Sequence, residues 1–497
     1  MTKTPYETLC LKMKEATLLG QAQGILAWDN YCYMPEKGID QRSQQLALLS
    51  KLIHQWSTDP VVGQLLKDSS QMADITPIQQ RNLALWQKEY DRETKIPTDL
   101  VQKVTEQSAK TEHLWRTARE KNDFKLVQLD LEKLFELRKE YGAKLDESKS
   151  PYNNLLDMYE PNMTEAMVSE YFSVLKEGSI RVMKKCLSAA DIPDPAIIRL
   201  KTPIPQQEQI SKLLMDLLGL TPDKSRLDKV AHPFTIGAYD DVRITTHYLE
   251  GDPIGCMYSV IHEGGHALYE LNLPDEHRYT AIGRSVGLGV HESQSRFAEN
   301  IIGRNPEFLG YLLPKIQEIA PVFKDISLSN FVKAVNGVQA TKVRIYADEV
   351  TYSLHVIMRF EIEKMLFNDQ CTIAELPQVW NNKIEEFFGL KVDSDAEGVM
   401  QDTHWYGGMF GYFPDYALGN VYDGSFYNQM KKDVPEWESQ LKVGNTKEIL
   451  TWLDTKVQKM GSLYDPADLV EHVTGEKPNA KYFIDYLDEK YQKIFNY

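Results

Sequence analysis

The stretch VIHEGGHALY, residues 260–269, decides how the rest of the chain has to be arranged. It puts His262 and His266 four residues apart, with Glu263 beside the first histidine, and residues four apart share one face of a helix. The flanks on both sides are largely apolar, which predicts a mostly buried helix. Histidine and glutamate side chains in a buried helix need partners. The spacing is therefore typical of a zinc site with a general base next to it.

A catalytic zinc site of this kind needs a third protein ligand. Glu270 lies one turn past the second histidine and beyond the expected metal position, so closing the site with it looks strained. A metzincin would have glycine at 269 and histidine at 272, but this chain has Tyr269 and Asn272, which excludes that class. Glu292, on the next predicted helix, can approach across a helical hairpin and is the preferred third ligand. Glu299 is the reserve, and a simple surface carboxylate is the alternative.

Glu263 faces the open position of such a site. There it can accept a proton from a metal-activated water and pass it to the leaving amine. His291 is either a partner that orients a ligand or an ordinary residue at a helix start. The paired glycines Gly264 and Gly265 cost about 1 kcal/mol each in a helix, which indicates that another segment or a substrate comes close to them.

Composition narrows the class of protein. The chain has 497 residues, 42% of them hydrophobic, and a formal net charge of −16, which argues against nucleic acid or an anionic membrane as a partner. It has five scattered cysteines, an odd number that fits a reducing compartment better than a disulfide framework. Because residues 1–20 contain no apolar core of signal-peptide length, we expect a cytoplasmic protein.

The hydrophobic pattern predicts helices along most of the chain. The expected helical regions are 6–54 with an aromatic bend at 28–35, 76–148, 165–189, 207–218, a helix from near residue 291, 310–390, and the end of the chain after a glycine- and aromatic-rich loop at 407–414. Residues 230–236 and 241–248 are expected to form a β-hairpin. The predicted fold is mainly α: one large helical domain with a deep active-site groove and a small sheet beside the HExxH helix. Its parts are N-terminal helices over 1–225, the catalytic motifs over 226–425 and C-terminal helices over 426–497.

Six short motifs occur in an order that resembles the carboxypeptidase Taq family of zinc metallocarboxypeptidases. They are HPF at 232–234, DVRIT at 241–245, HEGGH at 262–266, HESQ at 291–294, VRIYAD at 343–348 and GVMQDTHW at 398–405. The resemblance implies zinc on His262, His266 and Glu292, with Glu263 as general base. It also implies a helical fold with a long groove, a homodimer, and broad-specificity removal of single residues from peptide C-termini. We also expect that another divalent ion such as Co²⁺ can replace zinc at this site.

A carboxypeptidase has to recognise a terminal carboxylate, and arginine offers a two-pronged donor for it. Arg243 alternates with its neighbours on one face of the predicted strand, where an exposed strand arginine is the alternative. Arg344 begins a polar stripe on an expected helix, where an ion pair with Asp348 is the alternative. His404 and Tyr412 in the glycine- and aromatic-rich loop can bind the oxyanion or the substrate, or simply pack with other rings.

His232, which precedes a proline, is a further substrate contact suggested by the resemblance. Two other functions stay open at this point: an aminopeptidase or endopeptidase with the same metal centre, and a helical scaffold with an accidental HExxH string. The arginines favour the carboxyl end of a peptide over the amino end.

Overall fold

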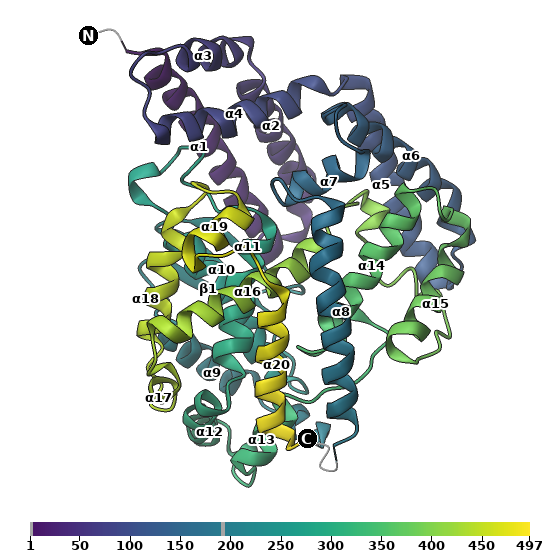
Figure 1. The fold of residues 1–497 in the computed structure, drawn as a ribbon, viewed down its shortest axis with the longest axis vertical. Helices are drawn as coiled ribbons and strands as arrows, with labels where there is room; N and C mark the ends of the chain where they lie inside the picture. Colours follow the sequence, from purple (N-terminus) through teal and green to yellow (C-terminus); the bar gives the residue numbers. More distant parts are fainter. Residues whose placement is uncertain (1–2, 190–193) are drawn as a thin grey trace.

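The computed structural model describes residues 3–189 and 194–497 and is built mainly of α-helices, with one small sheet (Figure 1). The predicted fold class is confirmed. The helices before the sheet are α1 (Pro5–Cys32), α2 (Ile39–Ser57), α3 (Pro60–Ser70), α4 (Pro77–Lys95), α5 (Thr98–Lys121), α6 (Lys125–Leu145), α7 (Pro151–Tyr159), α8 (Glu165–Leu187) and α9 (Ile204–Leu217).

Several of these helices begin in the same way. Thr4, Asp59, Thr76 and Ser150 each accept a hydrogen bond from a backbone N–H of the first turn, and a proline follows each of them. A capping side chain followed by proline starts a helix efficiently, because proline has no N–H to leave unpaired and its φ already suits a helix. The predicted aromatic bend is shorter than expected, since α1 continues through Trp28 to Cys32 before the chain turns into α2.

The sheet has three strands in the order β1-β3-β2, where β1 is Ser225–Lys229, β2 is Thr235–Ala238 and β3 is Asp241–Thr246. The hairpin of β2 and β3 is confirmed, although its strands are shorter than expected. The parallel strand β1 was missed, because the sequence SRLDK carries charges where a buried strand would be apolar.

The helices after the sheet are α10 (Pro253–Leu271), α11 (Leu288–Arg296), α12 (Pro306–Ile319), α13 (Leu328–Val335), α14 (Tyr352–Phe367), α15 (Leu376–Phe388), α16 (Pro414–Asp433), α17 (Trp437–Leu441), α18 (Lys447–Lys456), α19 (Pro466–Thr474) and α20 (Ala480–Phe495). A π-helical segment, Phe297–Gly303, continues α11 directly. Short 3₁₀ turns lie at Glu36–Gly38, Pro195–Arg199, Asp275–His277, Pro321–Phe323, Arg344–Tyr346, Ile373–Glu375, Trp405–Gly407 and Gln458–Met460.

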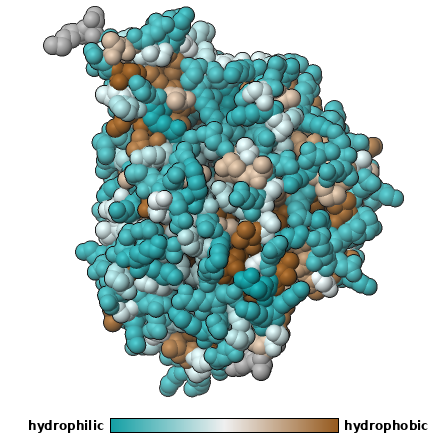
Figure 2. All heavy atoms as spheres, viewed as in Figure 1, coloured by the Kyte–Doolittle hydropathy of each residue, from teal (hydrophilic) through white to brown (hydrophobic). Residues whose placement is uncertain are grey.

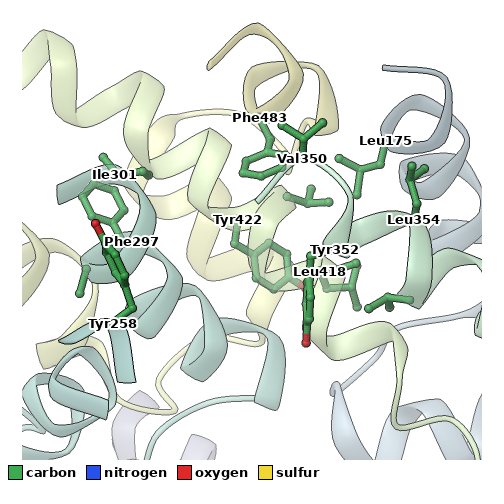
Figure 3. Close-up of a cluster of buried hydrophobic side chains, with 14 of the residues drawn as sticks. Leu175, Tyr258, Phe297, Ile301, Val350, Tyr352, Leu354, Leu418, Tyr422 and Phe483 are labelled. Atoms are coloured by element: carbon green, nitrogen blue, oxygen red, sulfur yellow. The ribbon is translucent and has the colours of Figure 1, made fainter. Parts of the chain in front are cut away.

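One large hydrophobic core joins most of these elements, with side chains from the region of α5 to the end of α20. Figure 3 shows part of it, in which Leu418 and Tyr422 of α16 lie near Leu354 of α14 and Phe483 of α20. The long helices α8 and α20 run side by side (Figure 1). The N-terminal helices α1, α3 and α4 form a smaller cluster of their own.

The two glycines of the HExxH helix serve close packing. A Cβ on Gly265 would lie 2.5 Å from the Gln294 carbonyl oxygen of α11, and a Cβ on Gly264 would lie 2.5 Å from Leu218. Of the two explanations given by the sequence, contact with another segment is therefore the one observed.

The helix that was expected around Arg344 does not form, so this prediction was wrong. Residues 336–351 hold turns and the 3₁₀ turn Arg344–Tyr346, and α14 starts only at Tyr352. The cause is Asp348, whose side chain accepts hydrogen bonds from the backbone N–H groups of Val350 and Thr351 and so competes with a continuous helix.

The face of the molecule in Figure 2 is mostly hydrophilic, with small hydrophobic patches, one of them over the N-terminal helices at the upper left. Among the described residues, no helix combines the length and the apolar character that crossing a membrane requires.

Candidate metal and substrate site

His262 and His266 of α10 and Glu292 of α11 converge on one point. Glu292 Oε2 lies 3.8 Å from His262 Nε2 and 3.5 Å from His266 Nε2. One ligand atom from each of the three residues lies within 4.8 Å of the others. Two imidazole nitrogens and one carboxylate oxygen are the donor set of an open catalytic zinc site. The donors that the sequence preferred are therefore brought together, and they fit a divalent ion.

Glu299, the reserve ligand, takes a different position. Its Oε2 lies 2.9 Å from His262 Nδ1, the ring nitrogen that points away from the cluster. This contact places the imidazole proton on Nδ1 and leaves Nε2 free to face a metal. Arg304 in turn holds Glu299 at 3.0 Å.

Arg296 holds the predicted third ligand in place, with Nε 2.8 Å from Glu292 Oε1. Burial alone would raise the pKa of Glu292, but Arg296 and His262 outweigh it and hold that pKa well below its usual range. Glu292 is therefore ionised, the state that coordination of a metal ion would require. Burial also lowers the pKa of His266 to about 3, so its imidazole is neutral.

Glu263 is 7% exposed and turned toward β2, where Thr235 Oγ1 donates a hydrogen bond of 2.6 Å to its carboxylate. Burial raises the pKa of Glu263 above its ordinary value. A carboxylate with a raised pKa holds a proton more readily at neutral pH, which suits a group that has to take one up and hand it on.

His291 orients its neighbours. Its ring stacks on that of His266, with 4.5 Å between the centroids, and its Nε2 lies 2.9 Å from Glu270. Of the two roles considered for His291, contact with a ligand histidine is the one that the structure supports. The Glu270 carboxylate accepts a hydrogen bond from Ser285 and lies within hydrogen-bond distance of His291. It is not part of the cluster of possible metal ligands, which is His262, His266 and Glu292.

Arg344 lies in a buried cluster of charged groups. Asp402 accepts from Arg344 at 2.9 Å and from Arg359 at 2.5 Å, so two guanidinium groups share one carboxylate. The ion pair with Asp348 expected as the alternative does not form, because Asp348 instead accepts from the backbone of its own turn. The cluster carries one positive charge in excess.

Tyr352 lies between this cluster and the predicted metal ligands. The guanidinium carbon of Arg296 lies 4.0 Å from the centre of its ring, and Arg344 Nη1 donates to its hydroxyl at 3.2 Å. The excess positive charge therefore lies one aromatic ring away from the group that holds Glu292.

Arg243 faces away from the metal helix. Thr235 and its partner Ile244 face α10, whereas Ile236 and its partner Arg243 face α1. Arg243 bonds Asp241 at 2.8 Å and lies 4.2 Å over the ring of Trp28. It borders a cavity of about 640 Å³ that also reaches Glu270.

The remaining predicted contacts lie in different surroundings. His404 packs on Phe413, with centroids 4.5 Å apart, and burial lowers its pKa to about 4. Tyr412 packs against Tyr159; burial chiefly raises the pKa of Tyr412, and Glu292 is among the carboxylates that raise it further. His232 is exposed in the bend before β2.

Several residues of the site were not found from the sequence. Arg296 follows Glu292 at position i+4 of one helix face, a spacing that could have revealed it. Glu299 was considered as a reserve ligand, but its contact with His262 Nδ1 was not predicted. Thr235 and Asp402 left no such signal, because their contacts join segments far apart in the chain.

The chain is similar to known metallopeptidases over most of its length. Residues 8–491 match the family described as carboxypeptidase Taq (M32) metallopeptidase. Carboxypeptidase 1 of Bacillus subtilis is 36% identical over 97% of this chain and 97% of its own length. Thermostable carboxypeptidase 1 of Thermus thermophilus is 35% identical over 99% of both.

Solved structures are similar over the whole chain. The M32 carboxypeptidase of Deinococcus radiodurans superposes with a TM-score of 0.97 at 29% identity and covers 100% of both chains. Pyrococcus furiosus carboxypeptidase does so with a TM-score of 0.96 at 31% identity over 99% of both chains. The chain therefore belongs to the carboxypeptidase Taq (M32) family of metallopeptidases and is a peptide hydrolase of the metallocarboxypeptidase type.

Proposed function

We propose that this enzyme is a zinc-dependent carboxypeptidase of broad specificity, with His262, His266 and Glu292 as metal ligands and Glu263 as general base. The observation that carries the proposal is the pairing of two features: a cluster of two histidines and one carboxylate, and an excess positive charge one tyrosine ring away. The first suits hydrolysis and the second suits a free carboxylate.

The residues present fit a metal. Both Nε2 atoms face Glu292, and the opposite nitrogen of His262 is held by Glu299. When bound, zinc polarises a carbonyl group and lowers the pKa of water, and another divalent ion such as Co²⁺ can take its place.

Glu263 moves the proton. It takes one proton from the attacking water as the new C–O bond forms, and it delivers that proton to the amide nitrogen as the C–N bond breaks. The products are a shortened peptide and a free amino acid. Thr235 keeps the Glu263 side chain turned toward β2 through its 2.6 Å hydrogen bond.

Arg344 binds the terminal carboxylate in this proposal. Its countercharge Asp402 is shared with Arg359, so an incoming carboxylate finds a charge that is only partly neutralised. Arg243 is the second candidate for binding the terminal carboxylate, because its charge is already neutralised by Asp241.

The other proposed substrate contacts are His404, Tyr412 and His232. Tyr412, whose pKa is raised mainly by burial, keeps its proton and can donate it in a hydrogen bond to the developing oxyanion. His404 and His232 are carried over from the family motifs. The proposal extends to one catalytic domain over residues 1–497, supported by the family match over residues 8–491 and by the large core that joins the elements from α5 to α20. It also extends to a cytoplasmic homodimer, supported by the family resemblance and the few cysteines.

The test compares peptides that differ only at the C-terminus. We expect a peptide with a free carboxylate to lose its last residue, and its amidated counterpart to stay intact. Arg344→Ala should chiefly raise KM for the free peptide, whereas Arg116→Ala, on the exposed face of α5, is the matched control. Equal cleavage of both peptides would favour an endopeptidase and overturn the carboxypeptidase assignment. Purified protein without a divalent ion at near one per chain would count against the metal site.

A further inference from the structure

A cavity of about 640 Å³ lies beside the metal centre, between α1, the β2–β3 hairpin and the end of α10. We call it the α1 cavity; it is lined by Gly20 and Ile25 of α1, by Ile236 and Tyr239 of the hairpin, and by Glu270 and Leu273. Its volume is within the range of about 300–1,000 Å³ that small-molecule sites usually have.

The wall of the α1 cavity is in contact with residues of the metal site. Glu270 belongs to its wall and bonds His291, whose ring stacks on the ligand His266. The strand β2 runs beside α10 between Glu263 and Glu270. At one end Thr235 Oγ1 donates a hydrogen bond to the Glu263 carboxylate, and at the other the Tyr239 N–H donates one to the Glu270 carbonyl oxygen.

The cavity and Arg344 reach the predicted metal ligands through different residues. Arg344 connects to the metal ligands through Tyr352 and Arg296, and Arg296 lies 3.5 Å from Glu299, the partner of His262. Glu270 lies beyond His266, at the other end of the ligand pair. A peptide whose carboxylate is at Arg344 therefore extends its upstream residues toward the α1 cavity, an orientation that rests on the proposed function.

The distance can be expressed in residues. Glu270 is four residues past His266, a rise of about 6 Å along the helix. An extended peptide covers about 3.3–3.6 Å per residue, so the cavity begins about two residues upstream of the cleaved bond.

The charged groups of the wall are already paired within the chain. The ion pairs are Arg243 with Asp241, Arg278 with Asp240 and Arg284 with Glu89. Glu270 Oε1 lies 2.9 Å from His291 Nε2. A charged ligand group would meet no free countercharge there, whereas Ile25, Ile236 and Leu273 offer apolar contact.

Gly20 gives the cavity its width. Within a helix, glycine costs about 1 kcal/mol relative to alanine, a cost that normally reflects a close neighbour. Gly24 has one, since a Cβ there would lie 3.2 Å from Ile236. At Gly20 a Cβ would meet no atom of the described residues within 4 Å. Packing within the chain therefore does not explain this glycine, and the open space in front of it is the cavity.

We infer that the α1 cavity receives a neutral, apolar side chain of the peptide substrate, about two residues upstream of the cleaved bond, and that Gly20 leaves room for it. The cavity is thus a determinant of specificity, separate from the metal ligands and from the arginines that take the carboxylate.

The experiment uses two N-blocked tetrapeptides that share the same C-terminal dipeptide and carry either leucine or glycine at the upstream positions. The ratio of kcat/KM for the leucine peptide over the glycine peptide is the readout. We expect the wild type to prefer leucine about tenfold, the value of a modest apolar contact. In Gly20→Leu, which fills the cavity, the ratio falls to about one.

Folding should not obscure the result, because leucine is a better helix former than glycine. Gly310→Leu is the matched control: it makes the same change on α12, beside a different cavity, and should keep the wild-type ratio. A wild-type ratio near one, or a Gly20→Leu enzyme that keeps the wild-type ratio, overturns the inference. Failure of the proposed function is seen separately, as equal cleavage of a blocked dipeptide and its amide by the wild type.

Discussion

Glu299→Gln tests whether the residues behind the metal ligands control metal affinity. The substitution keeps the size of the side chain but removes the charge that lies 2.9 Å from His262 Nδ1. Removing the partner of a ligand histidine typically weakens metal binding about 10–100-fold, or about 1.4–2.7 kcal/mol. We expect a value in the upper half of this range, because Arg296 and Arg304 also lose the countercharge of Glu299. Arg296 then competes more strongly with the metal ion for the Glu292 carboxylate.

The assay is competition for zinc between the enzyme and a chelator at fixed pH, which requires no turnover. Glu361→Gln is the control, since Glu361 also makes two ion pairs, with Lys176 and Lys383, at a distance from the site. Affinity equal to that of the wild type would refute the reasoning. A loss as complete as that in Glu292→Gln would show instead that Glu299 is itself a ligand.

Four further outcomes are expected. Glu263→Gln should retain the metal but lower kcat about 10²–10⁴-fold, and a nearly normal kcat in the metal-loaded variant would remove Glu263 from the base role. Asp402→Asn should lower Tm by about 3–5 °C, from about 3–5 kcal/mol for two buried guanidinium groups spread over an unfolding entropy of about 2.1 cal/mol/K per residue. Asp369→Asn is the control, because the Asp369 carboxylate is 80% exposed beside Lys139, and it should leave Tm unchanged. Equal shifts of Tm in the two variants would contradict the argument. Burial raises the pKa of Glu363 to about 7. The folded chain therefore holds this proton more tightly than the unfolded chain, and stability falls as the pH rises from about 4.5 to about 7, by on the order of 3 kcal/mol. Glu363→Gln should flatten this part of a plot of Tm against pH, and a slope like that of the wild type would count against it. Finally, Gly265→Ala should weaken zinc binding in the chelator assay, because its Cβ would displace the backbone of the helix that carries Glu292; unchanged affinity would show that α11 adapts without moving the ligand.

The sequence was sufficient to predict what depends on local pattern. The HExxH helix, the hairpin before it and Glu292 on the next helix all follow from spacing and hydrophobic periodicity. The mainly α architecture follows from the same periodicity.

Contacts between distant segments could not be predicted in this way. Asp402 forms an ion pair with Arg344, 58 residues earlier in the chain, and the local sequence around either residue does not predict that contact. The apolar pattern around Arg344 favoured a helix, but the side chain of Asp348 bonds the local backbone and prevents it. Arg243 was assigned to the correct strand, while the face it occupies depended on where α1 packs.

The helix face that carries Glu292 has a consequence for how the enzyme acquires its metal. Glu292, Arg296, Glu299 and Arg304 alternate in sign along one side of α11 and the π-helical segment, and each neighbouring pair is in contact. The carboxylates near the ligand histidines are thus neutralised by the protein itself, so the ligands are assembled before any ion arrives. Small zinc-dependent domains, in contrast, unfold when the ion is removed. We therefore expect that the ion can be withdrawn and replaced while the fold persists. The availability of each divalent ion, together with the geometry and the donor types of the site, then determines which one is bound.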